Sequence, residues 1–310
     1  MIDGLNIAVR WALYVNLMLL FGLPCFAIYG LRGSKSASDV FPLSAIVLVL
    51  SMIALPISCL GLALTATSMA GIPLSDLDHA TVNMVVMQTP VGAAWLVRMA
   101  ALIIIAVLVA WRRSALGTGA MMALSLTTGV ALASLAWGGH GAADEGAFGI
   151  VHLTSDITHL LAAGAWLGAL VALGMMVFRP AVKMTDDHLR LTHRALRGFS
   201  VAGTIIVALI ILSGLANTWI VVGPEHVLDL PATRYGQLLI AKLILFVMML
   251  GLAATNRFRL TPAFDQALKT GGTSAVVRQL RYSLILETSA ALAILGLVAW
   301  LGTLEPPMSL

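Results

Sequence analysis

Charged residues are scarce in this chain. Only 10% of its 310 residues are Asp, Glu, Lys or Arg, whereas 60% are hydrophobic, and the mean hydropathy is +0.98. Soluble domains carry about 25% charged residues, so this composition excludes an ordinary soluble protein and indicates a membrane protein. Long polar connections are also lacking, because the longest expected ones, such as 65–91 and 257–281, are too short for a soluble catalytic domain.

Several functional signatures are absent too. No lysine follows a glycine, which excludes the phosphate-binding GxxxxGK[ST] loop of ATP-driven pumps, and no HExxH metalloprotease motif occurs. The only two cysteines, Cys25 and Cys59, lie in apolar runs near opposite membrane faces, so we expect no disulfide. These absences favour a transport or binding function, and no enzymatic activity is expected.

Long apolar runs dominate what remains. A membrane-spanning helix needs about 20 apolar residues, and eight such runs occur, at 7–29, 41–64, 92–111, 117–137, 150–178, 198–220, 234–256 and 282–303. The sequence therefore predicts an all-α polytopic protein with eight transmembrane helices. We expect residues 1–310 to form one integral membrane domain surrounded by lipid.

The positive charges are distributed unevenly. Fourteen of the 18 Lys and Arg residues lie in the first, third, fifth and seventh connections. The other connections are acidic and carry Asp76, Asp78, Asp144, Glu145, Glu225 and Asp229. By the positive-inside rule the basic connections are cytoplasmic and both termini lie outside. The net charge of +4 thus reflects membrane orientation, and no nucleic-acid partner is expected.

A short pattern occurs twice, at an offset of 144 residues. Thr89-Pro-Val-Gly92 is followed by Arg98, and Thr233-Arg-Tyr-Gly236 is followed at the same distance by Lys242. Four helices per half would preserve orientation, so we interpret the pattern as a possible parallel repeat with a site between the halves. The halves would span residues 1–140 and 150–305.

Three ionisable residues share one face of the fifth predicted helix. His152, Asp156 and His159, here called the ladder, are spaced four and three residues apart. At 100° per residue they lie within about 40° of a common line, over a rise of about 10 Å. Imidazole binds copper, zinc, iron and nickel, and a nearby carboxylate can act as a ligand or orient the ring. The open alternative is that these groups are buried polar residues bonded to carbonyls and water.

Further polar residues extend the candidate site. His140 lies on a Gly-rich turn just before the ladder helix and would complete an outward-facing metal site. Ionisable residues inside membrane spans are functional candidates by default, which singles out Arg98, Lys242 and Glu287 as charge partners or ion-path residues. Arg98 or Lys242 would neutralise Asp156, whereas Glu287, about one turn from its helix end, would also be free to pair with Arg281 or Arg257. His79 is a weaker candidate in an acidic external connection.

The combination of motifs resembles the copper-resistance D family of CopD/PcoD-type proteins. The resemblance is strongest over 150–307 and rests on the segment 152–168, Phe199-Ser200, Ser213-Gly214, Asn217, Tyr235-Gly236 with Lys242, Asn256-Arg257, Leu280-Arg281 with Glu287, and Pro306-Pro307. It implies a bacterial inner-membrane protein of copper homeostasis with periplasmic termini. It also implies a separate periplasmic donor of the CopC type, because this chain shows no fused domain of that kind.

Three functions remain open at this point. The leading hypothesis is movement of copper ions from periplasm to cytoplasm along His140, His152, Asp156 and His159. One alternative is a haem-binding redox protein that uses membrane histidines as axial ligands. The other is a non-transporting membrane protein that binds copper as the partner of a periplasmic chaperone.

Overall fold

The computed structural model describes residues 2–31, 42–111, 117–138, 146–180 and 184–305. Within these ranges there is no strand, and eight helices are long and apolar enough to cross a membrane. They are α1 (Ile2–Gly30), α3 (Leu43–Ala70), α5 (Pro90–Trp111), α6 (Thr118–Ala133), α7 (Gly146–Val177), α8 (Asp186–Val222), α9 (Arg234–Thr255) and α11 (Thr273–Leu301). The predicted all-α architecture with eight spans is confirmed.

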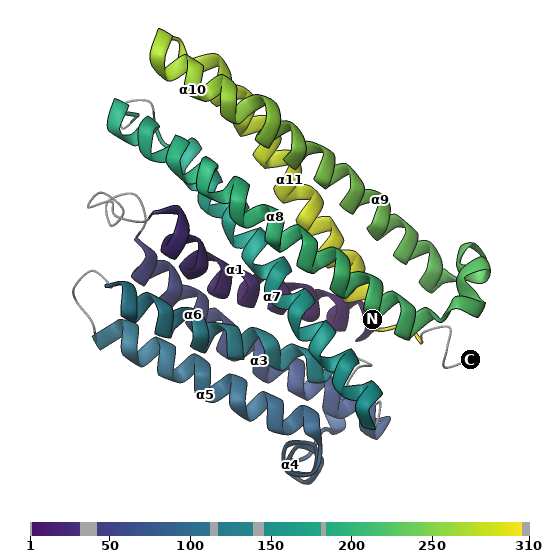
Figure 1. Cartoon of the computed structure of the whole chain (residues 1–310). Helices are drawn as coiled ribbons and strands as arrows, with labels where there is room; N and C mark the ends of the chain where they lie inside the picture. Colours follow the sequence, from purple (N-terminus) through teal and green to yellow (C-terminus); the bar gives the residue numbers. More distant parts are fainter. Residues whose placement is uncertain (1, 32–41, 112–116, 139–145, 181–183, 306–310) are drawn as a thin grey trace.

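Short helices occupy the two ends of the bundle. Figure 1 shows both termini and α4 (His79–Gln88) at one end, here called the termini end, together with the helix η5 (Pro224–Ala232). The opposite end, called the α10 end, carries α10 (Thr261–Thr270), which follows the π-helix η6 (Asn256–Leu260). Eight crossings would leave both termini on one side of the membrane, and the expectation that this is the outer side stays a prediction. The remaining short helices are η1 (Leu74–Asp76) and η2 (Ser134–Gly138).

The helices at the α10 end are longer than hydropathy predicts. Helix α8 begins at Asp186 instead of residue 198, and α11 begins at Thr273 instead of residue 282. Hydropathy locates only the apolar part of a helix, whereas these added turns are amphipathic. The first turn of α8 is further stabilised because the Thr185 hydroxyl accepts a hydrogen bond from the His188 amide at 3.3 Å.

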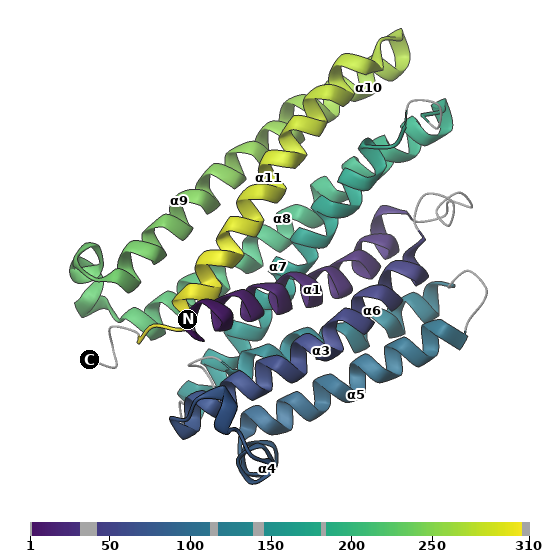
Figure 2. The same ribbon diagram turned by 180° about the vertical axis from the view of Figure 1, so that it is seen from behind.

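The two halves of the chain form two groups of four helices. Within the first half each helix packs on two others of that half, so that a closed ring is formed by α1, α3, α5 and α6. In the second half α7 packs on α8 and α11, and α11 packs on α9, but α8 and α9 do not pack closely on each other. Figures 1 and 2 show α9 and α11 running side by side at the edge of this group. The second group is therefore an open arrangement.

Helices α1 and α7 join the two halves through glycines. Gly22 of α1 lies directly against Gly164 and Gly168 of α7, so closely that a Cβ atom at Gly22 or Gly168 would overlap the backbone of the facing helix. Small residues spaced four apart allow membrane helices to approach at backbone distance. This contact brings the ladder helix α7 to the centre of the molecule.

Candidate metal site

The ladder residues lie on α7 at the boundary between the two halves. His152 is only 2% exposed, and its Nε2 lies 3.9 Å from Oδ2 of Asp156. Both residues and His159 line one cavity of about 200 Å³, here called the histidine cavity. Its walls come from α1 and η2 of the first half and from α7, α8, α9 and α11 of the second. The predicted common face of the ladder therefore points into a cavity and not into lipid.

Helix α8 holds the ladder in place through hydrogen bonds. The Asn217 amide donates to Oδ1 of Asp156 at 2.6 Å, as expected for an interhelical asparagine. The Ser155 hydroxyl donates to the Ser213 carbonyl at 3.0 Å. Gly214 of α8 makes room for the His159 ring, whose Cε1 would lie 3.3 Å from a Cβ at that position. These bonds fix the rotamers of the ladder before any ion arrives.

One of these hydrogen bonds determines which nitrogen of His159 is available. His159 Nδ1 lies 3.0 Å from the Ser213 hydroxyl oxygen, and that hydroxyl donates its single proton to the Leu209 carbonyl at 2.5 Å. The short bond to the Leu209 carbonyl favours the arrangement in which the oxygen accepts from Nδ1–H, and this arrangement leaves the lone pair on Nε2. An imidazole oriented in this way by its other nitrogen is the usual form of a metal-binding histidine.

Lys242 of α9 completes the charge balance of the histidine cavity. It lines the cavity and interacts electrostatically with Asp156, which also interacts with His152. The Asp156 carboxylate is thus the one acidic group among the described lining residues, and both an ammonium and an imidazole compete for it. A cation that enters the cavity therefore meets a carboxylate whose negative charge is already partly offset by Lys242 and His152.

The structure does not bring the other candidates into this cavity. His140 lies outside the described residues. His79 is exposed at the first residue of α4 and does not line the cavity; hydrogen bonds from Thr81 hold the pKa of the neighbouring Asp78 carboxyl below its usual value. Arg98 lines a separate cavity in the first half. Lys242 is therefore the cation that the structure places beside Asp156.

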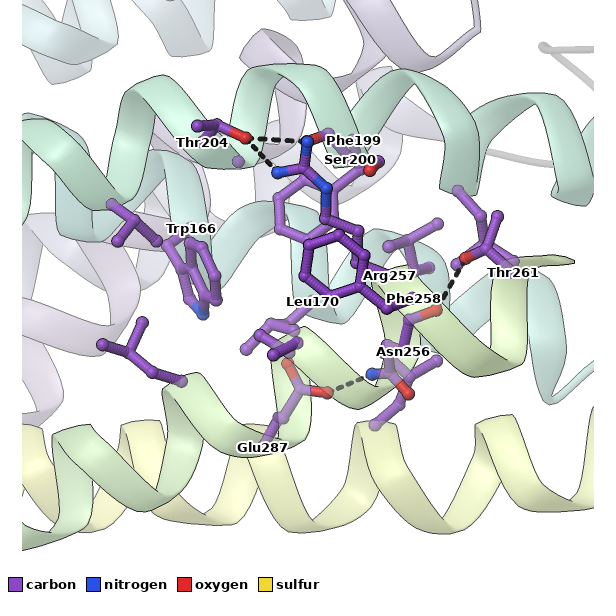
Figure 3. A pocket seen from close by; sticks show the side chains of 18 residues that line it. Trp166, Leu170, Phe199, Ser200, Thr204, Asn256, Arg257, Phe258, Thr261 and Glu287 are labelled. Atoms are coloured by element: carbon purple, nitrogen blue, oxygen red, sulfur yellow. Dashed lines mark hydrogen bonds between the residues drawn. The ribbon is translucent and has the colours of Figure 1, made fainter.

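Glu287 lies toward the α10 end in a cavity of about 220 Å³, the Glu287 cavity. It is 1% exposed and accepts hydrogen bonds from the Asn256 side chain and from the Ser283 hydroxyl at 3.3 Å, and Figure 3 shows the bond from Asn256. Because α11 begins at Thr273, Glu287 is about 21 Å along the helix and not one turn from its end. Both of these hydrogen-bond donors to Glu287 are neutral groups.

The two arginines considered as partners of Glu287 bind elsewhere. Arg281 donates from Nε to the Val177 carbonyl at 2.9 Å. Arg257 donates to the Thr204 hydroxyl, as Figure 3 shows. Both arginines therefore fasten helices of the second half together at the α10 end.

A third cavity lies between the first two. This middle cavity has a volume of about 240 Å³ and a mostly apolar lining that includes Met18 and Met249. It shares His159 and Lys242 with the histidine cavity and Trp166 with the Glu287 cavity. The three cavities thus form a row from the termini end toward the α10 end.

Comparisons with known proteins identify the family. A family model described as "Copper resistance protein D-like, N-terminal domain" matches residues 1–150, and one described as "Copper resistance protein D" matches 193–301. A curated relative named "Copper resistance protein D", from Pseudomonas syringae pv. tomato, is 45% identical over 99% of this chain and 98% of its own length. This chain belongs to the copper resistance protein D family.

A second relative is less similar in sequence. The "Inner membrane protein YebZ" of Escherichia coli is 27% identical over 97% of this chain and 98% of its own length. No solved structure matches this chain. The family and the eight spans together make this chain a multi-pass membrane protein of copper resistance.

The ladder offers the copper resistance protein an incomplete set of metal ligands. Within the described residues, no group of three His, Cys, Asp or Glu side chains is arranged to hold a metal ion. His152 and Asp156 can share an ion. His159 lies about one helical turn further along α7, so the three residues extend over the predicted rise of about 10 Å. Imidazole suits copper among other transition metals, and a neighbouring carboxylate can serve as a further ligand or orient the ring.

Ser213 and Asn217 carried part of the family resemblance, but the sequence analysis did not connect them with the ladder. They are spaced four residues apart on α8 and therefore share a face. Arg10 and Tyr14 were not singled out in the sequence. Arg10 and Tyr14 line the histidine cavity from α1. Arg10 lies inside the predicted span 7–29, and the rule that ionisable residues within spans are functional candidates applies to it as well.

Proposed function

We propose that this protein moves copper ions across a bacterial inner membrane, from the periplasm at the termini end to the cytoplasm at the α10 end. The observation that carries the proposal is that His152, Asp156 and His159 line one cavity. It shares lining residues with the middle cavity, which in turn shares Trp166 with the Glu287 cavity. The basic residues of the α10 end support this orientation by the positive-inside rule.

The proposed path has three stages. Copper first binds His152 and Asp156, with His140 as an additional ligand on the periplasmic side. It then passes to the free Nε2 of His159 and enters the middle cavity, where the thioethers of Met18 and Met249 are available as soft ligands. Glu287 is the acidic residue at the far end of the row.

The driving force needs no nucleotide. An inside-negative potential favours cation entry by about 2.3 kcal/mol per charge for each 100 mV. The Lys242 ammonium beside Asp156 weakens cation binding in the histidine cavity, so the ion is released inward instead of being trapped. We infer that the donor is a periplasmic copper-binding protein of the CopC type, which would supply the ligands that the ladder lacks during transfer.

Cellular copper uptake tests the proposal. We expect the double variant His152→Ala/His159→Ala to accumulate copper at the rate of cells without the protein, when its membrane expression matches that of the wild type. His79→Ala is the matched control, because this imidazole is exposed outside the cavity, and it should leave uptake unchanged. Equal uptake by the double variant and the wild type would refute the role of the ladder.

Two measurements separate this proposal from its alternatives. A haem protein requires axial ligands on facing sides of the iron, whereas both described histidines that line the histidine cavity come from the single helix α7; a Soret band in the purified protein would nevertheless establish haem. Copper flux in proteoliposomes distinguishes a transport path from a protein that only presents copper to its partner.

A further inference from the structure

A small cavity in the first half of the chain has a polar lining of one charge sign. It measures about 80 Å³ and lies between α1, α3, α5 and η2. Two guanidinium groups line it, those of Arg10 and Arg98, together with the polar side chains of Asn6, Tyr14, Thr65 and Ser134. We call it the arginine cavity. No acidic residue is among its described lining residues.

Arg98 is the central group of this cavity. It is only 8% exposed, and its buried Nε has no hydrogen-bond partner. The buried Nε of Arg10 lacks a partner as well. A guanidinium stays charged in proteins, and a buried charge is strongly unfavourable unless it is paired and hydrogen-bonded. Arg98 therefore requires a negative charge, and the half-buried Arg10 adds a second positive charge to a cavity whose described lining provides no acidic residue.

The neighbours of Arg98 cannot supply this charge. The groups that interact with it electrostatically are Tyr14 and Cys59. An ordinary phenol and thiol are both predominantly neutral at pH 7. The hydroxyls of Thr65 and Ser134 donate to carbonyls one turn earlier, those of Gly61 at 2.9 Å and Ala131 at 2.7 Å, so the donors left for a ligand include the two guanidinium groups and the Asn6 amide. A lining with these donors and no described acidic residue matches the chemistry of an anion.

The size and depth of the cavity narrow the choice of anion. Arg98 lies eight residues after Pro90, the first residue of α5, which is about 12 Å into the helix. This position lies within the apolar run 92–111 that predicts a membrane span, and the volume of about 80 Å³ suits a small ion with little water. We propose that the arginine cavity binds a small inorganic anion, chloride or a phosphate-type oxyanion, that enters from the termini end.

The bound anion would also affect the neighbouring histidine cavity. Arg10 and Tyr14 line both cavities. An anion between Arg10 and Arg98 would offset positive charge that otherwise repels a cation approaching Asp156. The anion site itself does not depend on copper transport, because it follows from the charges of the first half alone.

Thermal unfolding of the purified full-length protein in detergent, without copper, tests the proposal. The probes are chloride, inorganic phosphate and gluconate as sodium salts at matched ionic strength, and phosphatidylglycerol added in gluconate. We expect the Tm in chloride or phosphate to exceed that in gluconate by about 3 °C or more, because a ligand that binds only the folded state stabilises it. Arg98→Gln should abolish this difference, whereas Arg190→Gln, an exposed arginine on α8, should retain it.

Further variants and outcomes keep the test decisive. If Arg98→Gln does not fold, Arg10→Gln takes its place and should reduce the difference, while Arg98→Lys should retain part of it. The same Tm in all three salts would overturn the proposal, and so would a difference that persists in both Arg98→Gln and Arg10→Gln. Stabilisation by phosphatidylglycerol alone would assign the cavity to a lipid headgroup and would equally overturn a free inorganic anion.

Discussion

The two halves of the molecule contain similar helix N-termini at α5 and α9, but these helices pack differently. Thr89 and Thr233 each accept a hydrogen bond from the amide of a glycine three residues later, Gly92 at 3.1 Å and Gly236 at 3.0 Å. Both glycines lie directly against the backbone of the preceding short helix. Yet α5 belongs to a closed ring, whereas α9 packs on α11 and does not pack closely on α8. In the apolar stretch of the span that contains α9, 11% of the residues are buried, compared with 28% of the residues in that of α5.

This difference decides what the two corresponding cations face. Arg98 lies in a small cavity without a described acidic residue, while Lys242, at the same place in the repeated pattern, lies beside Asp156 in a row of three cavities. In the two proposals made above, the closed ring encloses an anion site and the open group leaves space for a cation path. The duplication that the pattern suggests stays a prediction, because similar turns do not establish a common origin.

The contact between the halves is the most sensitive part of this arrangement. We expect Gly168→Ala to destabilise the protein by about 3 kcal/mol, because the added methyl would overlap the Gly22 backbone. Gly174→Ala on the same helix meets open space and should leave stability equal or slightly higher. Tm values of the two purified variants measure the difference, and equal values would show that α1 and α7 do not need this close approach.

The hydrogen bond that orients His159 should matter next most. Ser213→Ala removes the acceptor for Nδ1–H, and losing such an orienting group typically lowers metal affinity by about 10- to 100-fold. Thr154→Ala on the exposed face of α7 is the matched control and should bind copper as the wild type does. Copper titration of the purified proteins checks this, and unchanged affinity in Ser213→Ala would remove His159 from the ligand set.

Lys242 tests the charge difference between the halves directly. Lys242→Met leaves Asp156 without its ammonium neighbour, so we expect the equilibrium affinity for copper to rise by about tenfold. Release should slow in parallel, so flux in proteoliposomes should fall although binding improves. Lys242→Arg keeps the positive charge and should resemble the wild type. Weaker copper binding in Lys242→Met would show that the lysine supports the site instead of competing with the cation.

The sequence predicts the frame of this protein better than the site within it. Apolar run length is a local property, so all eight spans and the family could be identified from it and from short motifs. The closed and open groups could not, because the spans of both halves are apolar on most faces and periodicity does not select their neighbours. The added turns of α8 and α11 were missed since amphipathic helix outside the bilayer has low hydropathy.

The candidate site divides in the same way. The common face of His152, Asp156 and His159 follows from helical geometry, and the structure places that face on a cavity. Whether Asp156 interacts with Lys242 or with Arg98 depends on which helices pack together. The spacing of residues along the sequence does not determine this. Glu287 was expected near a helix end because the first turns of α11 are polar and were not included in the predicted span. The structure shows that α11 begins at Thr273, well before Glu287.

The two threonine caps provide the smallest effect and the most direct comparison. Thr89→Ala and Thr233→Ala each remove one side-chain cap from a helix N-terminus, and such a loss costs about 1 kcal/mol. Because the local bonds are nearly identical, we expect equal decreases in Tm although the helices differ in burial. A larger decrease for Thr233→Ala would mean that α9, which has few packing partners, depends on its cap more than α5 does. That result would locate the difference between the halves in the helix ends as well as in the packing.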